Sequence, residues 1–449
     1  MKRTIIILIV CFVATQAAAQ NVLIRGVILN YSNQMQVEDM SEISDLSLPS
    51  LERNFILDSS GNFSVSFKLS KANYFRIGRN ILYLTPGDSL EVKLDFNKPT
   101  NALFKGNNRT SILANEYLRF TPFPKGGSFL DAGKHLKKTI QATIDTIQVI
   151  ALQRKQELDQ TKLVNTAFYQ LESIRIKADI VNSIYHIPVY YAWKYKLKGD
   201  SLQQFMDEAK RISKPYYSQY LKDAIDPDYL KIAVYRDVIY TVLDNAPETE
   251  KSNKVKEFDR AATIFNKLQG LNNKTEITAL LPDIKSVKDP NYQLASSKTY
   301  DRKMGLANGD KAPDLQFLDK NHKTVSLKSF KGKIVYIDLW ASWCGPCLEE
   351  MPHLDSLKKK FSKNQDIVFI SLSIEDNFQS WKNYIDKKQF SGVQLYIDRS
   401  ALKDYSVITI PRIIIIDRDF SIASLSGSLP SSTKTFDFLN KLVVKAGKP

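Results

Sequence analysis

The stretch YIDLWASWCGPCLEEMP contains two cysteines separated by only two residues, an arrangement that few folds and few chemistries use. The stretch covers residues 336–352, and Cys344 and Cys347 are two of only three cysteines in 449 residues. The third, Cys11, lies in an N-terminal segment that we expect to be removed. No cysteine then remains for a structural framework, so the pair is present for chemistry or for a metal.

The N-terminus has the pattern of a secretory signal. Lys2 and Arg3 precede an apolar run of about ten residues, which is too short to span a bilayer. Ala17–Ala19 then supply the small residues that a signal peptidase requires. We predict a signal peptide over residues 1–20 and an exported chain in the periplasm or cell envelope, where disulfides persist. A lipoprotein acylated at Cys11 is the alternative.

The composition is that of a globular protein with a basic surface. Hydrophobic residues make up 43% of the chain and the formal net charge is +15. A positive charge can favour anionic partners, but no nucleic-acid motif accompanies it, so we predict a solvated lysine-rich surface and no nucleic-acid partner. No later apolar run reaches transmembrane length. The length suggests roughly two or three domains and leaves the oligomeric state undetermined.

Residues 21–108 have the pattern of β-strands. FSVSFKL (63–69) and LEVKLDF (90–96) alternate apolar and polar residues, which is typical of strands with one buried face. DSSGN and TPGD supply turn residues. We therefore predict a small antiparallel β-sandwich in this region.

The rest of the chain divides into a helical and a mixed part. Residues 109–290 carry apolar residues at helical spacings with few glycines or prolines. Residues 291–304 are expected to form a linker. From 305 to 449, apolar β-rich runs alternate with helical patterns, and such alternation predicts an α/β sheet covered on both faces. The chain as a whole is predicted to be multi-domain.

Four chemical roles compete for the two cysteines. A zinc site needs four ligands, yet there is no second cysteine pair and the four histidines are scattered. Haem attachment of the c type needs a histidine after the second cysteine, where this chain has Leu348. A structural disulfide over so short a loop would stabilise little. The fourth role is a dithiol that cycles with a disulfide.

The local sequence meets the physical demands of such cycling. The reacting group is the thiolate, and a strand ending at Leu339 followed by a helix starting near Cys344 places that sulfur at a helix N-terminus. The helix dipole and unpaired N–H groups there favour negative charge. Pro346 fits in the first turn. Cys347 lies on the same side of the turn, so it can resolve a mixed disulfide formed at Cys344.

The motif WCGPC resembles the active site of thioredoxin-fold oxidoreductases. Its surroundings, GDKAPDLQFLD and VSLKSFKGKIVYIDLWASWCGPCLEEMPHLDSL, resemble the extracytoplasmic TlpA/ResA-like thiol-disulfide oxidoreductases over residues 305–449. The resemblance implies a thioredoxin-like fold, with Cys344 as the nucleophile and Cys347 as the resolving thiol. The pattern that precedes a peroxidatic cysteine is absent, which argues against a peroxiredoxin.

The resemblance also assigns further site residues. Pro411 matches the cis-proline that faces the dithiol, and the backbone of Ile410 is expected to pair with bound substrate. Trp343, Gly345 and Pro346 are expected at the substrate-binding surface. We also expect Asp338 to be the buried acid beneath the dithiol and Glu350 an acidic residue near it. Desolvation raises the pKa of a carboxyl group on an apolar strand, which suits an acceptor for the proton of Cys347.

These features predict an extracytoplasmic protein-disulfide reductase that needs no cofactor and no metal. Its partners would be disulfide-containing envelope proteins and, as the resemblance implies, a membrane-embedded thiol that donates electrons. Oxidation or isomerisation of the same class of substrate is the first alternative. A binding or assembly protein whose redox domain is secondary is the second alternative, since the first 290 residues carry no catalytic motif.

Overall fold

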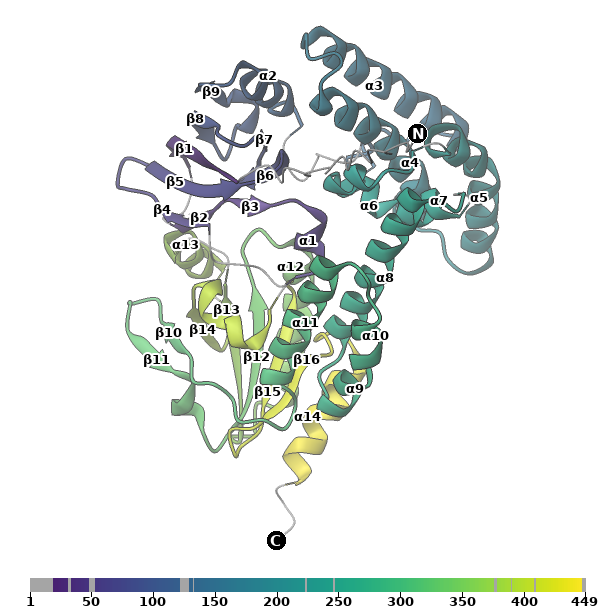
Figure 1. The fold of residues 1–449 in the computed structure, drawn as a ribbon. Coiled ribbons are helices and arrows are strands. Elements are labelled where there is room, and N and C mark those ends of the chain that lie inside the picture. The colour runs from purple at the N-terminus through teal and green to yellow at the C-terminus, as the bar shows by residue number, and fades with distance from the viewer. Residues whose placement is uncertain are drawn as a thin grey trace, which may run out of the picture.

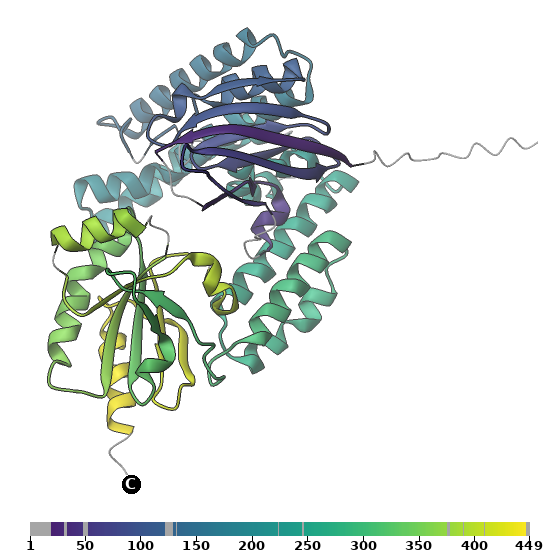
Figure 2. The ribbon, with the colours of Figure 1, turned by 90° about the vertical axis from the view of Figure 1, so that its left-hand side faces the viewer.

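The computed structural model describes residues 19–445 apart from 31–33, 48–52, 122–128, 132, 223, 245–246, 375–377, 389 and 408. Most of the predicted signal peptide, residues 1–18, lies outside the described residues. A β-rich region, a helical region and a mixed region follow one another along the chain (Figure 1). The β-rich region lies above the C-terminal one, and helices of the middle region run along one side of both (Figure 2).

The β-rich region is built on a four-stranded sheet with the order β5-β1-β8-β9. These strands are β1 (Gln20–Leu29), β5 (Asn62–Leu69), β8 (Ser89–Asp95) and β9 (Leu103–Gly106). β1 pairs antiparallel with β5 but parallel with β8, so the prediction of a wholly antiparallel region is wrong for this pair. Alternation reveals a strand's buried face but not the direction of its partner. Gly26 is required here, because a Cβ would lie 1.8 Å from the carbonyl oxygen of Val92.

Two smaller sheets complete this region. One pairs β2 (Gln34–Gln36) with β4 (Asn54–Ile56), and the other has the order β3-β6-β7, with β3 (Glu38–Asp39), β6 (Asn73–Ile77) and β7 (Asn80–Leu84). All three sheets contribute side chains to one apolar core. Helix α1 (Glu42–Asp45) follows β3, and α2 (Arg109–Leu118) follows β9. The Asn115 amide of α2 bonds both backbone polar groups of Tyr83 in β7.

The middle region is helical, as the apolar spacing predicted. Its helices are α3 (Ile140–Gln160), α4 (Ala167–Tyr195), α5 (Gly199–Leu221), α6 (Ala233–Asp237), α7 (Ile239–Leu243), α8 (Glu250–Gly270), α9 (Lys274–Ala279), α10 (Leu281–Lys285) and α11 (Pro290–Gly305). Threonine side chains cap the N-termini of α3, α4 and α8 by accepting backbone N–H bonds. Within the described part of the chain, no helix combines the length and apolar character that crossing a membrane requires.

The predicted linker over residues 291–304 is wrong, because these residues form most of α11. The carboxylate of Asp289 accepts the N–H groups of Asn291 and Tyr292, and Pro290 occupies the first turn. Buried side chains then recur at helical spacing, from Tyr292 to Lys303. The polar composition of the segment concealed this stripe, which packs α11 against α8 and α9.

The C-terminal region is a seven-stranded mixed sheet with helices on both faces. Its strand order is β11-β10-β14-β13-β12-β15-β16, and β12, β13 and β14 run parallel. The elements are β10 (Gln316–Leu318), β11 (Thr324–Ser326), β12 (Ile334–Trp340), α12 (Gly345–Lys360), β13 (Ile367–Ser373), α13 (Phe378–Lys388), β14 (Val393–Tyr396), β15 (Arg412–Ile416), β16 (Ile422–Gly427) and α14 (Thr433–Lys445). This is a thioredoxin-like arrangement, as the resemblance implied.

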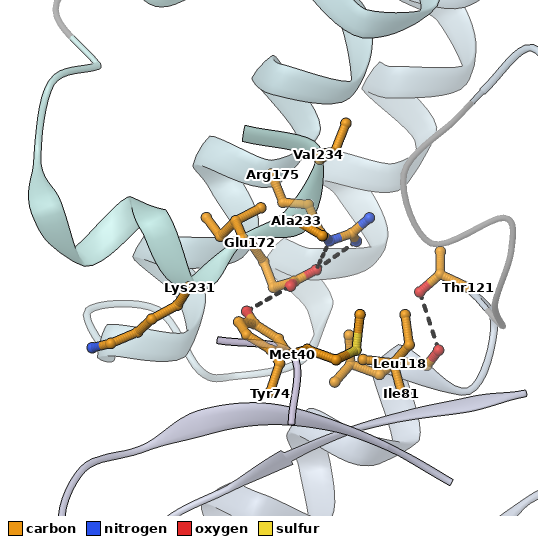
Figure 3. Close-up of a pocket in the computed structure, with 11 residues that line it drawn as sticks. Met40, Tyr74, Ile81, Leu118, Thr121, Glu172, Arg175, Lys231, Ala233 and Val234 are labelled. Atoms are coloured by element: carbon orange, nitrogen blue, oxygen red, sulfur yellow. Dashed lines mark hydrogen bonds and ion pairs between the residues drawn. The ribbon is translucent and has the colours of Figure 1, made fainter. Parts of the chain in front are cut away.

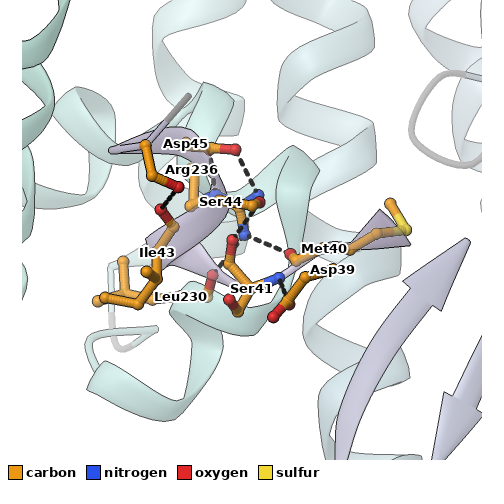
Figure 4. A network of polar contacts seen from close by, with 9 residues as sticks. Asp39, Met40, Ser41, Ile43, Ser44, Asp45, Leu230 and Arg236 are labelled. Carbon is orange, nitrogen blue, oxygen red and sulfur yellow. Dashed lines mark hydrogen bonds and ion pairs between the residues drawn. The ribbon is translucent and has the colours of Figure 1, made fainter. Parts of the chain in front are cut away.

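An arginine of the helical region fastens the segment that contains β3 and α1 (Figure 4). The guanidinium of Arg236, in α6, donates to both carboxylate oxygens of Asp45 at 2.5 and 3.1 Å. It also donates to the carbonyl oxygens of Met40 and Leu230 at 3.2 and 2.6 Å. Arg236 is buried, so these bonds replace the water that its charge would otherwise require. They fix the end of β3 to the helical region.

A hydrogen bond to a buried ion pair of α4 joins the β-rich and helical regions at a second place (Figure 3). The carboxylate of Glu172, fully buried in α4, accepts the hydroxyl of Tyr74 at 2.7 Å and the Nε–H of Arg175 at 2.7 Å. Tyr74 belongs to β6. A cavity of about 30 Å³ lies beside these groups, which is room for little more than a water molecule. The contact is therefore structural.

Replacing Arg175 by methionine should destabilise the fold strongly. Glu172 would remain buried with only the Tyr74 hydroxyl as a partner, and breaking a buried pair in this way costs about 3–5 kcal/mol. Urea unfolding followed by circular dichroism measures the change. The control is Lys254→Met, which breaks the exposed Lys254–Glu250 pair on α8, with side chains 60% and 85% exposed. It should have no measurable effect, and equal effects of the two variants would contradict this role of Glu172.

Candidate active site

The two cysteines lie where the central strand gives way to a helix. β12 is buried along its whole length, and after a short loop Cys344 forms the N-cap of α12. Cys344 and Cys347 form a disulfide, with their Cα atoms 5.2 Å apart. The backbone N–H of Cys347 points at the Cys344 sulfur, 3.3 Å away. Because helix N-termini favour negative charge, this position would stabilise a Cys344 thiolate after reduction.

A pocket of about 370 Å³ opens on one side of this disulfide. The residues that line it are Trp343, Cys344, Gly345, Pro346, Arg399, Thr409 and Ile410. Four of the seven, Trp343, Gly345, Pro346 and Ile410, are the predicted substrate-binding residues, so the fold brings them together around one volume. Trp343 is 62% exposed at its rim. Cys347 is 2% exposed and does not belong to the lining.

The loop that faces the dithiol contains the predicted proline. The peptide bond between Ile410 and Pro411 is cis, and Pro411 directly precedes β15. The side chain of Ile410 packs against the apolar cluster that contains both cysteines, Trp340 and Trp381. This places the loop beside the disulfide, on the wall of the pocket.

The two predicted acids are not part of the pocket lining. Asp338, in the middle of β12, is 4% exposed. Burial raises its pKa to about 7, an effect that Lys358 opposes and Glu350 reinforces. The carboxylate of Glu350, in α12, accepts the N–H and hydroxyl of Ser431 at 2.8 and 2.7 Å. Both acids are therefore close enough to interact, and Lys358 belongs to the same group.

The sequence prediction did not include Arg399 and Thr409, two residues of the pocket wall. Thr409 directly precedes the Ile410–Pro411 pair. Arg399 begins a short 3₁₀ helix that follows β14. β14 runs parallel to β13, and β13 to β12, so their carboxyl ends share the edge of the sheet that carries the dithiol. That rule could have pointed to residues just after 393–396, had the strand order been known.

Comparison with known proteins finds relatives of the C-terminal region. The Redoxin family matches residues 307–427. The thiol-disulfide oxidoreductase ResA of Bacillus thuringiensis is 30% identical over 147 residues, which cover 32% of this chain and 82% of that protein. Through this region, the chain belongs to the ResA-like thiol-disulfide oxidoreductases. Its enzymatic activity is accordingly thiol-disulfide exchange.

Two further proteins are similar to about a third of this chain or less. The thioredoxin-like protein YneN of Bacillus subtilis is 30% identical over 123 residues, covering 27% of this chain and 72% of that protein. The crystal structure of the thioredoxin domain of a Bacteroides vulgatus thiol-disulfide oxidoreductase is 26% identical, covers 31% of this chain and 99% of that domain, and has a TM-score of 0.28. The β-rich and helical regions lie outside the residues that the Redoxin family matches.

Among the described residues, no three His, Cys, Asp or Glu side chains are gathered as a metal ion would need. The ResA-like site offers two sulfurs, a pocket that one of them lines, and a buried acid on the strand that leads to them. Disulfide exchange needs only a thiolate, a second thiol and a proton acceptor.

Replacing Asp338 by asparagine should stabilise the protein in a pH-dependent way. The pKa of Asp338 is raised from 3.8 to about 7 in the folded chain. Between these two pH values, Asp338 therefore binds its proton more tightly in the folded chain than in the unfolded chain. The unfolding free energy of the natural protein should then fall as the pH rises from 4 to 7. The unfolding free energy of the asparagine variant should not show this fall, which amounts to roughly 4 kcal/mol at most for such a pKa shift. It should therefore be the more stable protein at about pH 8 and similar at about pH 4.

Urea unfolding of the oxidised protein at several pH values between these limits measures the difference. The same substitution at Asp437, exposed on α14, is the control and should change the unfolding free energy little at any of these pH values. A stability difference between the Asp338 variant and the natural protein that does not vary with pH would contradict the raised pKa.

Proposed function

We propose that this enzyme reduces disulfides in proteins outside the cytoplasm, with Cys344 as the nucleophile and Cys347 as the resolving thiol. The observation that carries the proposal is the unequal placement of the two sulfurs. Both sulfurs are largely buried, but Cys344, 6% exposed, forms part of the pocket wall, whereas Cys347, 2% exposed, is absent from the lining. A substrate disulfide in the pocket would meet Cys344 first, and Cys347 could act only on the bond formed there.

The proposed reaction has two exchange steps. The Cys344 thiolate attacks one sulfur of the substrate disulfide, the substrate S–S bond breaks, and the other substrate sulfur leaves as a thiolate. Cys347 then loses its proton and attacks the Cys344 sulfur, which releases the second substrate thiolate and forms the Cys344–Cys347 disulfide. Two electrons pass from the enzyme to the substrate, and the substrate thiolates take up protons as their pKa values require.

Asp338 is proposed as the acceptor of the Cys347 proton. Successive residues of a strand face opposite sides, so Asp338 shares a face with Tyr336, which packs in one apolar cluster with Leu354 and Leu357 of α12. The carboxyl group therefore lies on the face of the sheet that α12 covers. Its pKa of about 7 is intermediate between a free carboxyl group and a free thiol, so proton transfer in either direction is inexpensive. Glu350 would modulate this proton transfer, because its charge further raises the pKa of Asp338.

Charge near the dithiol supports reduction as the direction. A dithiol is strongly oxidising when its thiolate is strongly stabilised. Gly345 and Pro346 add no cation between the cysteines, and the negative charge of Glu350, together with that of Asp338 when it is ionised, opposes a thiolate. Both features favour a low reduction potential. Oxidation or isomerisation of the same substrates is the alternative outcome.

The place of action is inferred from the N-terminal sequence. Its basic residues, short apolar run and alanines favour export, and an exported reductase works in an oxidising compartment. It would consequently need a continuous supply of electrons. A membrane-embedded thiol donor is the source that the family resemblance implies, and disulfide-containing envelope proteins are the proposed substrates.

Replacing Cys347 by alanine should trap substrates on the enzyme. The first mixed disulfide would form at Cys344 but could not be resolved, so covalent complexes should accumulate in cells that express the variant with its own N-terminus. Non-reducing electrophoresis and mass spectrometry of the envelope fraction detect them. The double variant Cys344→Ala/Cys347→Ala is the control and should capture nothing. Complexes found in the cytosol alone would contradict the proposed location.

The reduction potential of the full chain should lie near that of thioredoxin, about −270 mV, rather than near the about −120 mV of DsbA. Equilibration with glutathione or dithiothreitol buffers, read by thiol alkylation, measures it. Glu350→Gln should make the potential less negative, because removing a negative charge favours the thiolate. Glu349→Gln is the matched control at an exposed neighbouring position. A natural protein as oxidising as DsbA would overturn the assignment as a reductase.

A further inference from the structure

The proton that Asp338 accepts has to leave a buried site before the next turnover. Asp338 is 4% exposed. In the disulfide form the Cys347 sulfur is bonded to Cys344, so it cannot take the proton back. The acid therefore needs a second connection, one that leads to solvent.

Two polar side chains lie beside Asp338 on neighbouring strands. In the register of the sheet, Asp338 of β12 lies opposite Ser371 of β13, and Ser371 lies opposite Gln394 of β14. Paired residues of adjacent strands share a face of the sheet, so these three residues form a polar row across the face that α12 covers. Neighbouring strands are about 4.8 Å apart, a separation that one water molecule can bridge with two hydrogen bonds.

The far member of this row has an unused hydrogen-bond acceptor. Among the described residues, the Oε1 atom of Gln394 is buried and has no partner, while its Nε2 group donates to the carbonyl oxygen of Ser391 at 2.9 Å. Ser371 is 3% exposed, and a serine hydroxyl can both donate and accept. A buried acceptor is costly unless something donates to it, and a water shared with Ser371 would do so.

The row ends at a group of polar side chains that reaches the surface. The Nζ group of Lys358, in α12, donates to the same carbonyl oxygen of Ser391 at 2.8 Å. The hydroxyl of Ser391 donates to the carboxylate of Asp355 at 2.7 Å, and the Asp355 side chain is 43% exposed. Lys358 also lowers the pKa of Asp338, and Asp338 raises that of Lys358. The charge of Lys358 therefore acts at the inner end of the row as well as the outer one.

We propose that Ser371 and Gln394 carry the Asp338 proton to solvent through water molecules held between them. The carboxyl group would give its proton to a water beside Ser371, the hydroxyl would pass one on, and a water at the Gln394 Oε1 atom would release it toward Asp355. Each O–H bond that breaks is replaced by one that forms. Asp338 ends as a carboxylate, which the positive charge of Lys358 stabilises. The proposal rests on the proposed role of Asp338 and adds two positioning residues to it.

Glu350 is the alternative exit for this proton. Its charge raises the pKa of Asp338, so it too acts on the buried acid. Its two carboxylate oxygens accept the N–H and the hydroxyl of Ser431. Each oxygen of Glu350 thus already has a donor, whereas Gln394 keeps an acceptor unused. This difference favours the row of Ser371 and Gln394.

The test measures how fast Asp338 exchanges its proton with solvent in the disulfide form of the full-length protein. Flash release of protons from a caged acid at about pH 7, near the pKa of this group, starts the protonation. The infrared band of the protonated carboxyl group follows it, and Asp338→Asn, which removes the band, assigns it. This form carries out no disulfide exchange, so the measurement does not depend on the direction of electron flow.

Substitutions in the row should slow this protonation. Ser371→Ala and Gln394→Met should each lower the rate about tenfold or more, because a positioned proton carrier typically contributes at least that much and a proton enters and leaves by the same route. The final protonated fraction should change little, since neither side chain titrates. Gln316→Met is the matched control, at an exposed position of β10 in the same sheet, and should leave the rate unchanged.

Each outcome decides the proposal. Unchanged rates in both variants overturn it. A rate that falls in Glu350→Gln and in neither variant of the row shows that the proton leaves by Glu350, which also overturns it. Either variant alone is sufficient, provided that its circular dichroism spectrum matches that of the natural protein.

The proposed function fails in a different way. A natural protein that does not reduce a peptide disulfide would contradict the disulfide exchange, whatever the rate at which Asp338 takes up its proton. Slower protonation in Ser371→Ala and Gln394→Met would still establish the route to solvent.

Discussion

The site depends on the burial of strand β12 and on the helix that follows it. All seven residues of β12 are buried, and the strand is hydrogen-bonded on both sides, to β13 and β15. Its carboxyl end is therefore fixed by the sheet, and the N-terminus of α12 is fixed with it. Cys344 receives its position from this backbone, so the dithiol can open and close without a framework of other disulfides.

Much of this arrangement could be predicted because it depends on patterns among residues that are close together in the sequence. The apolar run of β13, Ile367–Ser373, has the bounds that its composition indicates, and the motif WCGPC itself brings Trp343, Cys344, Gly345 and Pro346 to one turn. Arg399 could not be found in this way. Its place in the pocket follows from β14 being the second neighbour of β12 in the sheet, and no local pattern specifies strand order.

The same limit explains the errors elsewhere in the chain. The parallel pairing of β1 with β8 joins residues more than sixty positions apart, and the alternation in each strand is equally compatible with either direction. Helix α11 was missed because its apolar stripe is interrupted by polar residues such as Ser296 and Thr299, which are nevertheless buried. Burial of such polar groups is decided by the neighbouring helices, which sequence periodicity does not describe.

Groups from distant parts of the chain act on the surroundings of the dithiol. Asp338 is buried in β12, where its charge is costly. Arg399, in the wall of the pocket beside Cys344, interacts electrostatically with Glu38 of β3. The segment that follows β3 is in turn hydrogen-bonded by Arg236 of the helical region. The β-rich region therefore acts, through Glu38, on a residue of the pocket, and the helical region helps to hold the segment that carries this glutamate.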